Sequence, residues 1–416
     1  MTSYNKHRPI SVVMVGIGGY GHHYTSILIK EFYRGFINIK AAVELFPDNS
    51  FHTQWFLKQG IPVYHTLEQV YTNINHVDLV IIASPIHFHI PQSSLALEQG
   101  SHVLCDKPLA STIQDAAALI KIKKDSARHM LVGYQWSYSS PIQQLKKDIQ
   151  KGLFGKPIRI KTLCLWPRGF EYYSRNDWAG KVKDKDGNWI LDSPANNAMA
   201  HFLHNLLYLL GKKIDSSALP SSIEAETYKA YSIPNYDTIA ARVLVNDETE
   251  LLFYASHSAQ KRLGPMFNLQ FEHATVTYGE TSKTILCEEN QGQSLEYGNP
   301  DSENPFKKFY ESIKVVKNLK KVLCGPEAAY PQTLTVNGIQ DSAPGKHSFP
   351  SSLIQHSNSG ESLWVKDLDK ILYNCYLNSC LPSEKGIKWA VKGKRINMKT
   401  YRFFPGGQPQ RKKNAL

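Results

Sequence analysis

The chain has 416 residues, of which 42% are hydrophobic and 20% are charged, a composition ordinary for a globular protein. Its formal charge of +12 is spread along the chain and no zinc-finger or RNP-like pattern occurs, so we expect a basic surface and no nucleic-acid binding. No run reaches the roughly 20 apolar residues of a membrane span. The six cysteines are scattered without a CxxC pair, which favours a reduced, cytoplasmic protein without a disulfide framework.

The first part of the chain alternates strand and helix signals. We expect strands at 10–15, 37–46, 61–64, 77–83, 102–105 and 130–133, with helices at 20–35, 52–59, 66–72, 91–99 and 113–124. The run VDLVIIA at 77–83 is continuously apolar, as in a strand buried on both faces of a sheet. This β-α repeat predicts an α/β fold, a doubly wound parallel (Rossmann) sheet within a dinucleotide-binding domain of residues 1–134.

After Tyr134 the pattern changes. We expect strands at 158–166, 223–231, 238–245, 250–257, 267–271 and 274–278, helices at 141–150, 195–210, 304–321 and 327–342, and a long loop at 343–366. Alternating strands without regular crossover helices favour an antiparallel sheet. Residues 135–416 are therefore predicted to form an α+β domain for substrate binding and oligomerisation, with a largely antiparallel open sheet and a basic C-terminal tail that includes Arg411, Lys412 and Lys413.

A glycine-rich turn follows the first expected strand. Gly16-Ile17-Gly18-Gly19-Tyr20-Gly21 is a G-x-G-x-x-G sequence placed directly before a helix. In a dinucleotide-binding turn the first glycine permits the turn, the second admits the pyrophosphate to the backbone, and the third lets the helix pack closely. The alternative is an ordinary glycine-rich connection.

The end of the second expected strand bears on the choice of dinucleotide. An acid there usually binds the adenosine ribose. Phe46 stands where that acid is expected, and Glu44 lies two residues earlier on the same side of the strand. No Arg or Lys follows closely to hold the 2′-phosphate of NADP, so NAD is favoured over NADP. The alternative is that Glu44 is a surface residue.

Two polar loops follow buried strands, at the edge where doubly wound sheets bind ligands. They are Ser84-Pro85-Ile86-His87-Phe88-His89 and Cys105-Asp106-Lys107-Pro108. A partly buried Lys107, fixed between an acid and a proline, would have a lowered pKa and could move a proton to or from a hydroxyl during hydride transfer. The alternative is a surface lysine paired with Asp106.

With these motifs the chain resembles the Gfo/Idh/MocA oxidoreductases, which include glucose–fructose oxidoreductase and inositol dehydrogenases. The resemblance rests on the glycine turn, the Ser84-Pro85 loop and the run 97–108, where Asp106 replaces the family's usual glutamate. It implies that Lys107 is the catalytic lysine and that the subunits form a homodimer or homotetramer. The cofactor-binding residues predicted in this way are Gly16, Ile17, Gly18, Gly19, Tyr20, Gly21, Glu44, Ser84, Pro85, His89, Asp106 and Lys107.

The resemblance also implies a second part of the site on the expected helix 195–210. There the family often has Asp-x-Gly-x-His-x-x-Asp, whereas this chain has Asn197, His201 and His204. As helix positions i, i+4 and i+7 these residues share one face. His201 could then assist Lys107 while Asn197 binds the substrate hydroxyl. A metal site at the two histidines is not favoured because no carboxylate is near in sequence, so we predict no metal, and a purely structural role is the remaining alternative.

Aromatic residues and arginines are interleaved at 166–181. Aromatic faces pack on sugar C–H groups and arginines bind hydroxyls or carboxylates; the alternative is an ordered structural loop. We predict an NAD(P)-dependent oxidoreductase acting on a secondary hydroxyl or keto group of a sugar, cyclitol or sugar derivative. An NAD-dependent glycoside hydrolase of the same fold and a non-catalytic dinucleotide-binding protein are the alternatives. The predicted substrate-binding residues are Lys107, Trp166, Arg168, Tyr172, Tyr173, Asn197, His201 and His204.

Overall fold

The computed structural model describes residues 8–280, 282–343 and 345–406. The tail residues Arg411, Lys412 and Lys413 lie outside this part of the chain. By contacts between residues the chain divides into two compact units. The first unit comprises Met1–Ala110, Asp115–Tyr138 and Glu303–Ala329, and the second comprises Ser111–Gln114, Ser139–Ser302 and Tyr330–Leu416. Within the described ranges, none of the helices combines the length and the apolar character needed to cross a membrane.

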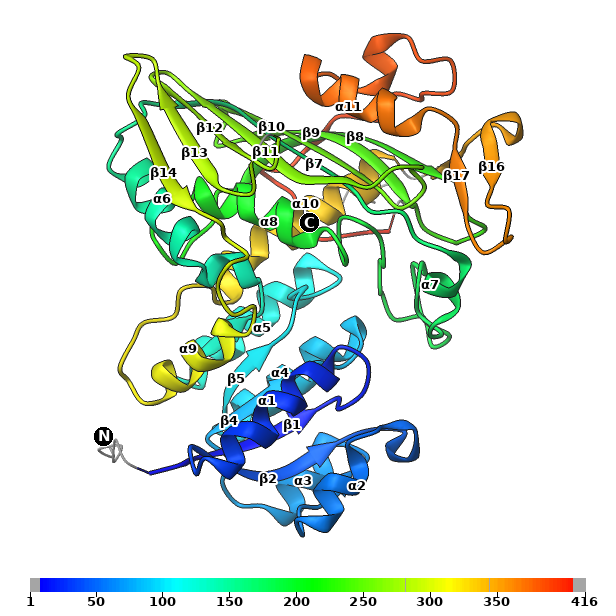
Figure 1. The fold of residues 1–416 in the computed structure, drawn as a ribbon. Coiled ribbons are helices and arrows are strands. Elements are labelled where there is room, and N and C mark those ends of the chain that lie inside the picture. Colours follow the sequence, from blue (N-terminus) through cyan, green and yellow to red (C-terminus); the bar gives the residue numbers. More distant parts are fainter. Residues whose placement is uncertain (1–7, 281, 344, 407–416) are drawn as a thin grey trace, which may run out of the picture. The chain divides into compact units, whose positions relative to one another are not determined.

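A six-stranded parallel sheet in the order β3-β2-β1-β4-β5-β6 organises the first unit (Figure 1). Every residue of β1, β4, β5 and β6 is buried, which explains their continuous apolar sequences. The strand order reverses between β1 and β4, as in a Rossmann sheet, so the predicted fold class is confirmed. The strands are β1 (Ile10–Val15), β2 (Ile37–Val43), β3 (Val63–Tyr64), β4 (Leu79–Ile82), β5 (His102–Cys105) and β6 (Met130–Val132).

The helices of this unit follow the strands, as expected from the β-α repeat. Thr66 caps α3 because its hydroxyl accepts the N–H of Gln69, whose side chain accepts in return from the backbone of Thr66. The second strand is shorter than expected: β2 ends at Val43, and the chain turns into a 3-10 helix at Pro47–Asn49. The helices are α1 (Gly21–Tyr33), α2 (Thr53–Lys58), α3 (Leu67–Asn73), α4 (His89–Glu98) and α5 (Ile113–Asp125).

A segment from late in the sequence completes the first unit. Helix α9 (Lys307–Val316) packs on β5 and on the short helix Gln135–Tyr138, and it buries Lys308 and Phe309. The sequence pattern assigned this helix to the second domain. Its contacts place it in the first unit, because its buried face is directed at the Rossmann sheet.

The second unit contains a ten-stranded sheet whose order is β14-β13-β12-β11-β7-β10-β9-β8-β15, with β18 beside β8. Among the strand pairs of the described residues in this sheet, only β7–β10 and β8–β15 are parallel, so the predicted largely antiparallel sheet is confirmed. The strands are β7 (Pro157–Leu165), β8 (Pro220–Lys229), β9 (Thr238–Val245), β10 (Thr249–Ser256), β11 (Leu263–Phe271), β12 (Ala274–Tyr278), β13 (Ile285–Glu289), β14 (Ser294–Gly298), β15 (His347–Ser348) and β18 (Ile396–Asn397).

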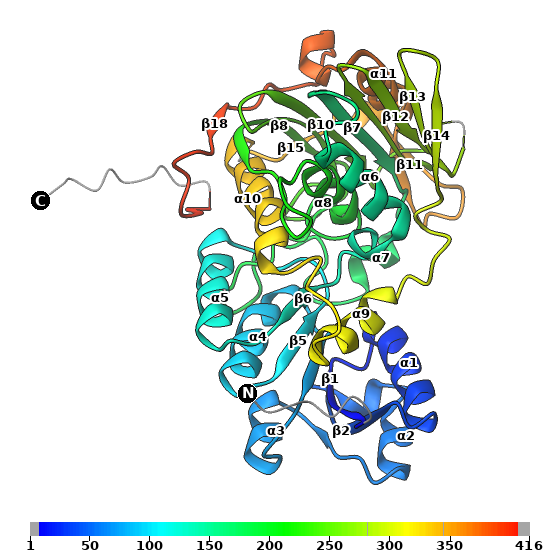
Figure 2. The ribbon, with the colours of Figure 1, turned by 90° about the vertical axis from the view of Figure 1, so that its left-hand side faces the viewer.

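Helices cover both faces of this sheet. Figures 1 and 2 show α8 (Ala200–Leu209) and α10 (Pro326–Ser342) on one face and α11 (Leu368–Asn378) on the other. The remaining helices are α6 (Ser140–Gln150), which contacts α8, and the short α7 (Phe170–Ser174) after β7. The expected loop at 343–366 was wrong in part, because it contains β15 and the hairpin β16 (Ile354–His356) and β17 (Leu363–Val365).

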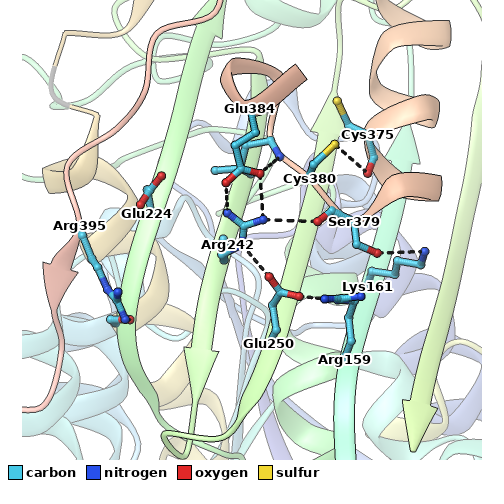
Figure 3. Close-up of polar contacts among 12 residues, drawn as sticks. Arg159, Lys161, Glu224, Arg242, Glu250, Cys375, Ser379, Cys380, Glu384 and Arg395 are labelled. Atoms are coloured by element: carbon cyan, nitrogen blue, oxygen red, sulfur yellow. Dashed lines mark hydrogen bonds and ion pairs between the residues drawn. The ribbon is translucent and has the colours of Figure 1, made fainter. Parts of the chain in front are cut away.

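Charged residues of the sheet bind α11 and the short helix Pro382–Lys385 that follows it (Figure 3). Arg242 on β9 donates to Glu250 at 2.7 Å and to Glu384 at 2.9 Å, and Glu250 also pairs with Arg159. The hydrogen bonds from Arg242 lower the pKa of Glu384, despite its partial burial. Lys161 donates to the carbonyl of Tyr376 at 2.8 Å. These ion pairs and hydrogen bonds supplement the apolar contacts between α11 and the same face of the sheet.

Candidate functional site

Two glycines of the predicted dinucleotide turn are required by the fold itself. Gly16 has φ +78°, and a Cβ there would lie 3.0 Å from the backbone of Ala83. A Cβ on Gly21 would lie 1.8 Å from the carbonyl oxygen of Gly16. Gly16 therefore permits the turn after β1, and Gly21 permits α1 to start directly against that turn.

Gly18 behaves differently from its two neighbours. It does not need a positive φ, and the nearest atom to a Cβ built on it is a carboxylate oxygen of Glu44 at 3.7 Å. Among the described residues, no other atom lies within 4 Å of that Cβ position. Open space above the backbone at this position is what a dinucleotide needs for its pyrophosphate to approach the turn. The residues present thus fit a bound dinucleotide.

Glu44 is the first residue after β2, and its carboxylate lies over the glycine turn. One oxygen accepts the N–H groups of Ile17 at 3.0 Å and Gly18 at 3.2 Å, and the other accepts only a long bond of 3.3 Å from Phe46. Because β2 ends at Val43, Glu44 stands at the strand end where a ribose-binding acid belongs. The expectation that Phe46 occupies that place was wrong: Phe46 lies beyond the strand and is 63% exposed.

His89 ties the two polar loops of the first unit together. Its ring nitrogens lie 2.7 Å from the carbonyl oxygen of Pro108 and 2.9 Å from that of Ser84. Burial lowers its pKa, although the two carbonyls act in the opposite direction. Ser84 in turn donates its hydroxyl to Gln92 at 2.6 Å. The His89 ring thus lies between the Pro108 and Ser84 carbonyls, and in its neutral form it donates its one N–H to one of them.

Asp106 is held in the core by a lysine that the sequence analysis missed. The ammonium of Lys308, on α9, lies 2.7 Å from the Asp106 carboxylate and 3.2 Å from the carbonyl of Gly133. Tyr24 donates its hydroxyl to the same carboxylate oxygen at 3.0 Å. Although burial acts to lower the pKa of Lys308, the Asp106 charge raises it above the ordinary lysine value. Asp106 is therefore committed to the interior.

Lys308 also contacts the glycine turn. Its ammonium lies 5.2 Å from the ring centroid of Tyr20, 5.0 Å from that of Tyr24 and 5.5 Å from that of Phe306. One buried cation thus links the start of α1 to the residue before Lys107. Lys107 itself is half-buried at the carboxyl end of β5. The first unit brings together the predicted cofactor residues in two groups, the glycine turn with Glu44 and the two loops joined by His89.

In the second unit, the three polar residues expected on one helix face are not arranged that way. Helix α8 begins at Ala200, so Asn197 lies in the turn before it, where its amide donates to the Asp192 carboxylate at 2.7 Å. His201 is half-buried in the first turn of α8. His204 is buried, and its ring stacks on Tyr208 at 5.5 Å. Burial and the nearby charge of Lys146 lower its pKa well below the ordinary histidine value, which fits a packing role.

The aromatic segment after β7 lies next to α8. The Trp166 ring contacts the Phe202 ring edge-on at 5.4 Å, and Arg168 lies over the Tyr172 ring at 4.9 Å. Tyr173 packs against Tyr231 at 4.8 Å, and burial raises its pKa well above the ordinary tyrosine value. The structure thus places Trp166, Arg168, Tyr172 and Tyr173 in one cluster, beside the helix that carries His201.

The glycine turn and its sheet have clear counterparts among known proteins. Residues 10–134 match the model of a family described as "Oxidoreductase family, NAD-binding Rossmann fold". A dehydrogenase of 1-carboxy-3-chloro-3,4-dihydroxycyclohexa-1,5-diene from Comamonas testosteroni is 32% identical over 87 residues, 21% of this chain and 22% of that protein. Inositol 2-dehydrogenase 1 of Saccharopolyspora erythraea is 27% identical over 99 residues, 24% of this chain and 29% of that protein. The chain thus matches less than a third of the length of either relative.

The likeness in structure extends over both units. The WlbA dehydrogenase from Bordetella pertussis, whose structure is a complex with NADH and UDP-GlcNAcA, aligns with a TM-score of 0.66. The alignment covers 81% of this chain and 97% of that protein, at 19% sequence identity. At this identity the likeness concerns the fold. Because the alignment covers more of the chain than the first unit contains, it includes part of the second unit.

Proposed function

We propose that this chain, whose residues 10–134 belong to the Gfo/Idh/MocA oxidoreductase family, is an NAD(P)-dependent oxidoreductase. Its proposed substrate is a sugar, cyclitol or sugar derivative, oxidised or reduced at a secondary hydroxyl or keto group. The observation that carries the proposal is the open space above Gly18, bordered by the Glu44 carboxylate. Gly18 has no positive φ and no close protein neighbour that would require glycine, so the approach of a ligand accounts for it.

The first unit would hold the dinucleotide through named groups. The glycine turn and the first N–H groups of α1 would hold the pyrophosphate, because the dipole at a helix N-terminus favours negative charge. The less engaged oxygen of Glu44 is suited to accept a ribose hydroxyl. When bound, the dinucleotide supplies a hydride acceptor or donor at its nicotinamide.

Lys107 is the proposed acid–base group. In the oxidation direction its neutral amine takes the proton of the substrate hydroxyl as the carbonyl forms, and in the reduction direction its ammonium returns that proton. His89 fixes the following residue, Pro108, and Lys308 fixes the preceding residue, Asp106. The backbone on both sides of Lys107 is therefore restrained, which limits the positions that its amine can sample.

Asn197 and His201 are the proposed substrate contacts of the second unit. The Asp192 carboxylate accepts from the Asn197 amide at 2.7 Å and so fixes the side chain proposed to contact the substrate hydroxyl. Asn197 cannot carry a proton as an aspartate would, so in this proposal the proton is carried by Lys107. We assign His204 to packing rather than to substrate binding.

A turnover screen tests the proposal. Purified protein is incubated with NAD or NADP and a panel of sugars, cyclitols and aryl glycosides, while the absorbance of the reduced nicotinamide is followed. Net reduction with at least one polyol supports the oxidoreductase. Release of the aryl group without net reduction would instead support a glycoside hydrolase. Stoichiometric dinucleotide binding with no turnover of any compound would support a binding protein.

A further inference from the structure

Three arginines gather over two aromatic rings in the second unit. The guanidinium carbon of Arg168 lies 4.9 Å from the ring centroid of Tyr172 and 6.0 Å from that of Trp166. Arg175 lies 3.7 Å from Tyr172, and Arg262, just before β11, lies 4.9 Å from Trp166. These five residues are called the arginine patch. Arg168 and Arg175 share one ring, and Arg168 and Arg262 share the other.

The positive charge of the arginine patch has no paired carboxylate in the described part of the chain. Among the described residues, none of its three arginines has a carboxylate within 4.0 Å. Asp192 acts on Tyr172 electrostatically, but its oxygens accept from the Gly180 N–H at 2.6 Å and from Asn197 at 2.7 Å. Cations that share ring faces repel one another, so the patch is suited to an anion from outside the chain.

Buried hydrogen-bond donors at the same place lack acceptors. The indole Nε1 of Trp166, the Nε of Arg168 and the hydroxyl of Tyr173 are all buried, and none has a hydrogen-bond partner within the described part of the chain. Native proteins leave few such donors without a partner, because burying one costs its hydration. Two of the three belong to the arginine patch itself. Oxygen acceptors of a ligand would satisfy them.

The backbone beneath the patch is fixed. His257 is buried, and burial lowers its pKa to about 3, so its ring is neutral. Its Nδ1 lies 2.9 Å from the carbonyl oxygen of Trp166, and its own carbonyl accepts the N–H of Arg168 at 3.0 Å. The Tyr172 ring lies 5.1 Å from the His257 ring. A neutral histidine thus supports the patch without adding a competing charge.

The arginine patch adjoins the proposed substrate contacts within the same unit. Trp166 touches Phe202, which directly follows His201 in α8. Asp192, whose charge acts on Tyr172, holds Asn197. A ligand whose oxyanion reaches the arginines and whose sugar ring covers Trp166 would therefore have Asn197 and His201 as its next neighbours.

We propose that the substrate is an anionic sugar derivative, whose oxyanion group binds the arginine patch while its ring packs on Trp166. This inference rests on the proposed oxidoreductase function and specifies its substrate class. Guanidinium groups form paired hydrogen bonds with both carboxylate and phosphate, so a uronate and a sugar phosphate share the required chemistry. A neutral sugar would leave the three arginines without a counter-charge.

Steady-state kinetics with matched substrates test this inference. A neutral aldose, its uronate and its phosphate ester are compared in the wild type and in Arg175→Gln and Arg262→Gln. We expect at least one anionic form to exceed the neutral form about tenfold or more in kcat/KM, mainly through KM. Each variant should bring that ratio toward one. Arg395→Gln, an exposed arginine outside the patch, is the matched control and should keep the wild-type ratio.

Comparison of the uronate with the phosphate ester identifies which oxyanion the arginine patch binds. Equal kcat/KM for the neutral and both anionic forms, unchanged in the arginine variants, would overturn the substrate class while leaving the oxidoreductase function intact. Calorimetric titration with the uronate and the phosphate ester tests the patch when the enzyme turns over none of the compounds. Binding that Arg175→Gln weakens supports the patch even when no compound is turned over, and absence of binding by both anions would overturn it.

Discussion

Replacing Lys308 by methionine removes the cation that faces Asp106 in the core of the first unit. The Lys308 side chain is fully buried, that of Asp106 is 9% exposed, and their charged atoms are 2.7 Å apart. Methionine has a similar length, so the change leaves little empty volume but strips the carboxylate of its counter-charge. Removing one partner of a buried ion pair costs about 3–5 kcal/mol, a large share of the roughly 5–15 kcal/mol that stabilises a domain.

Urea unfolding of wild type and Lys308→Met measures this cost as a shift of the midpoint. Lys307→Met is the matched control: Lys307 is the neighbouring residue, and its pair with Glu303 is partly exposed, so we expect a loss of about 1 kcal/mol or less. Adding Asp106→Asn to Lys308→Met should recover part of the stability, because the isolated buried charge is then gone. A Lys308→Met shift no larger than that of Lys307→Met would refute this account of the core.

Three further predictions concern the dinucleotide turn and the pH range of the fold. Gly18→Ala should keep the wild-type melting temperature but weaken dinucleotide binding, measured by calorimetry, tenfold or more, which is on the order of 1.4 kcal/mol. Gly21→Ala should lower the melting temperature. If both variants lower the melting temperature equally, the space above Gly18 is not open. Glu44→Gln should weaken dinucleotide binding by about 1.5–3 kcal/mol, and an unchanged dissociation constant would remove Glu44 from the ribose site. Burial, with His129 and Arg128 nearby, lowers the pKa of His102 from 6.5 to about 4. Between these two pH values His102 binds a proton in the unfolded chain but not in the folded protein. We therefore expect about 3 kcal/mol of folding stability to be lost as the pH falls from 6.5 to 4. Melting of His102→Gln from pH 7 to 4 should show a smaller acid loss, and an identical loss would contradict this assignment.

The Rossmann unit could be predicted because the burial of its strands and the position of its turn are visible in the sequence. Strands such as β4 are buried on both faces, and this shows as an unbroken apolar run. The roles of Gly16 and Gly21 follow from their spacing, since turn and helix start are only a few residues apart. The place of Glu44 was harder to see, because the end of β2 is set by the turn into Pro47 rather than by a change in hydrophobicity.

Lys308 could not be predicted from its sequence context. It lies 202 positions from Asp106, beside another lysine, Lys307, which is partly exposed. Only the face of α9 that packs on the first unit distinguishes the two lysines. A buried cation in an amphipathic helix carries no local signature, because its partner is supplied by a distant loop.

For the second unit, the sequence predicted the largely antiparallel sheet but not its last strands or the start of α8. Strand β12 alternates and β9 and β10 are almost wholly buried, so their sequences mark them as strands, but β14 is largely exposed and has no hydrophobic period. The prediction that Asn197, His201 and His204 share one helix face was wrong, because Asn197 lies before the helix begins. The chain forms successive turns up to Met199, with the Asn197 N–H bonded to the carbonyl of Ser193, and the helix begins only at Ala200.

The central claim, that Lys107 carries the proton of a dinucleotide-dependent oxidation, is tested most directly by Lys107→Met. With the substrate identified in the turnover screen, we predict that kcat falls by about 10²–10⁴-fold while the melting temperature is unchanged, and that added primary alkylamine restores part of the rate. Lys124→Met, an exposed lysine on α5, should keep the wild-type kcat. A Lys107→Met enzyme that turns over at the wild-type rate would contradict the account.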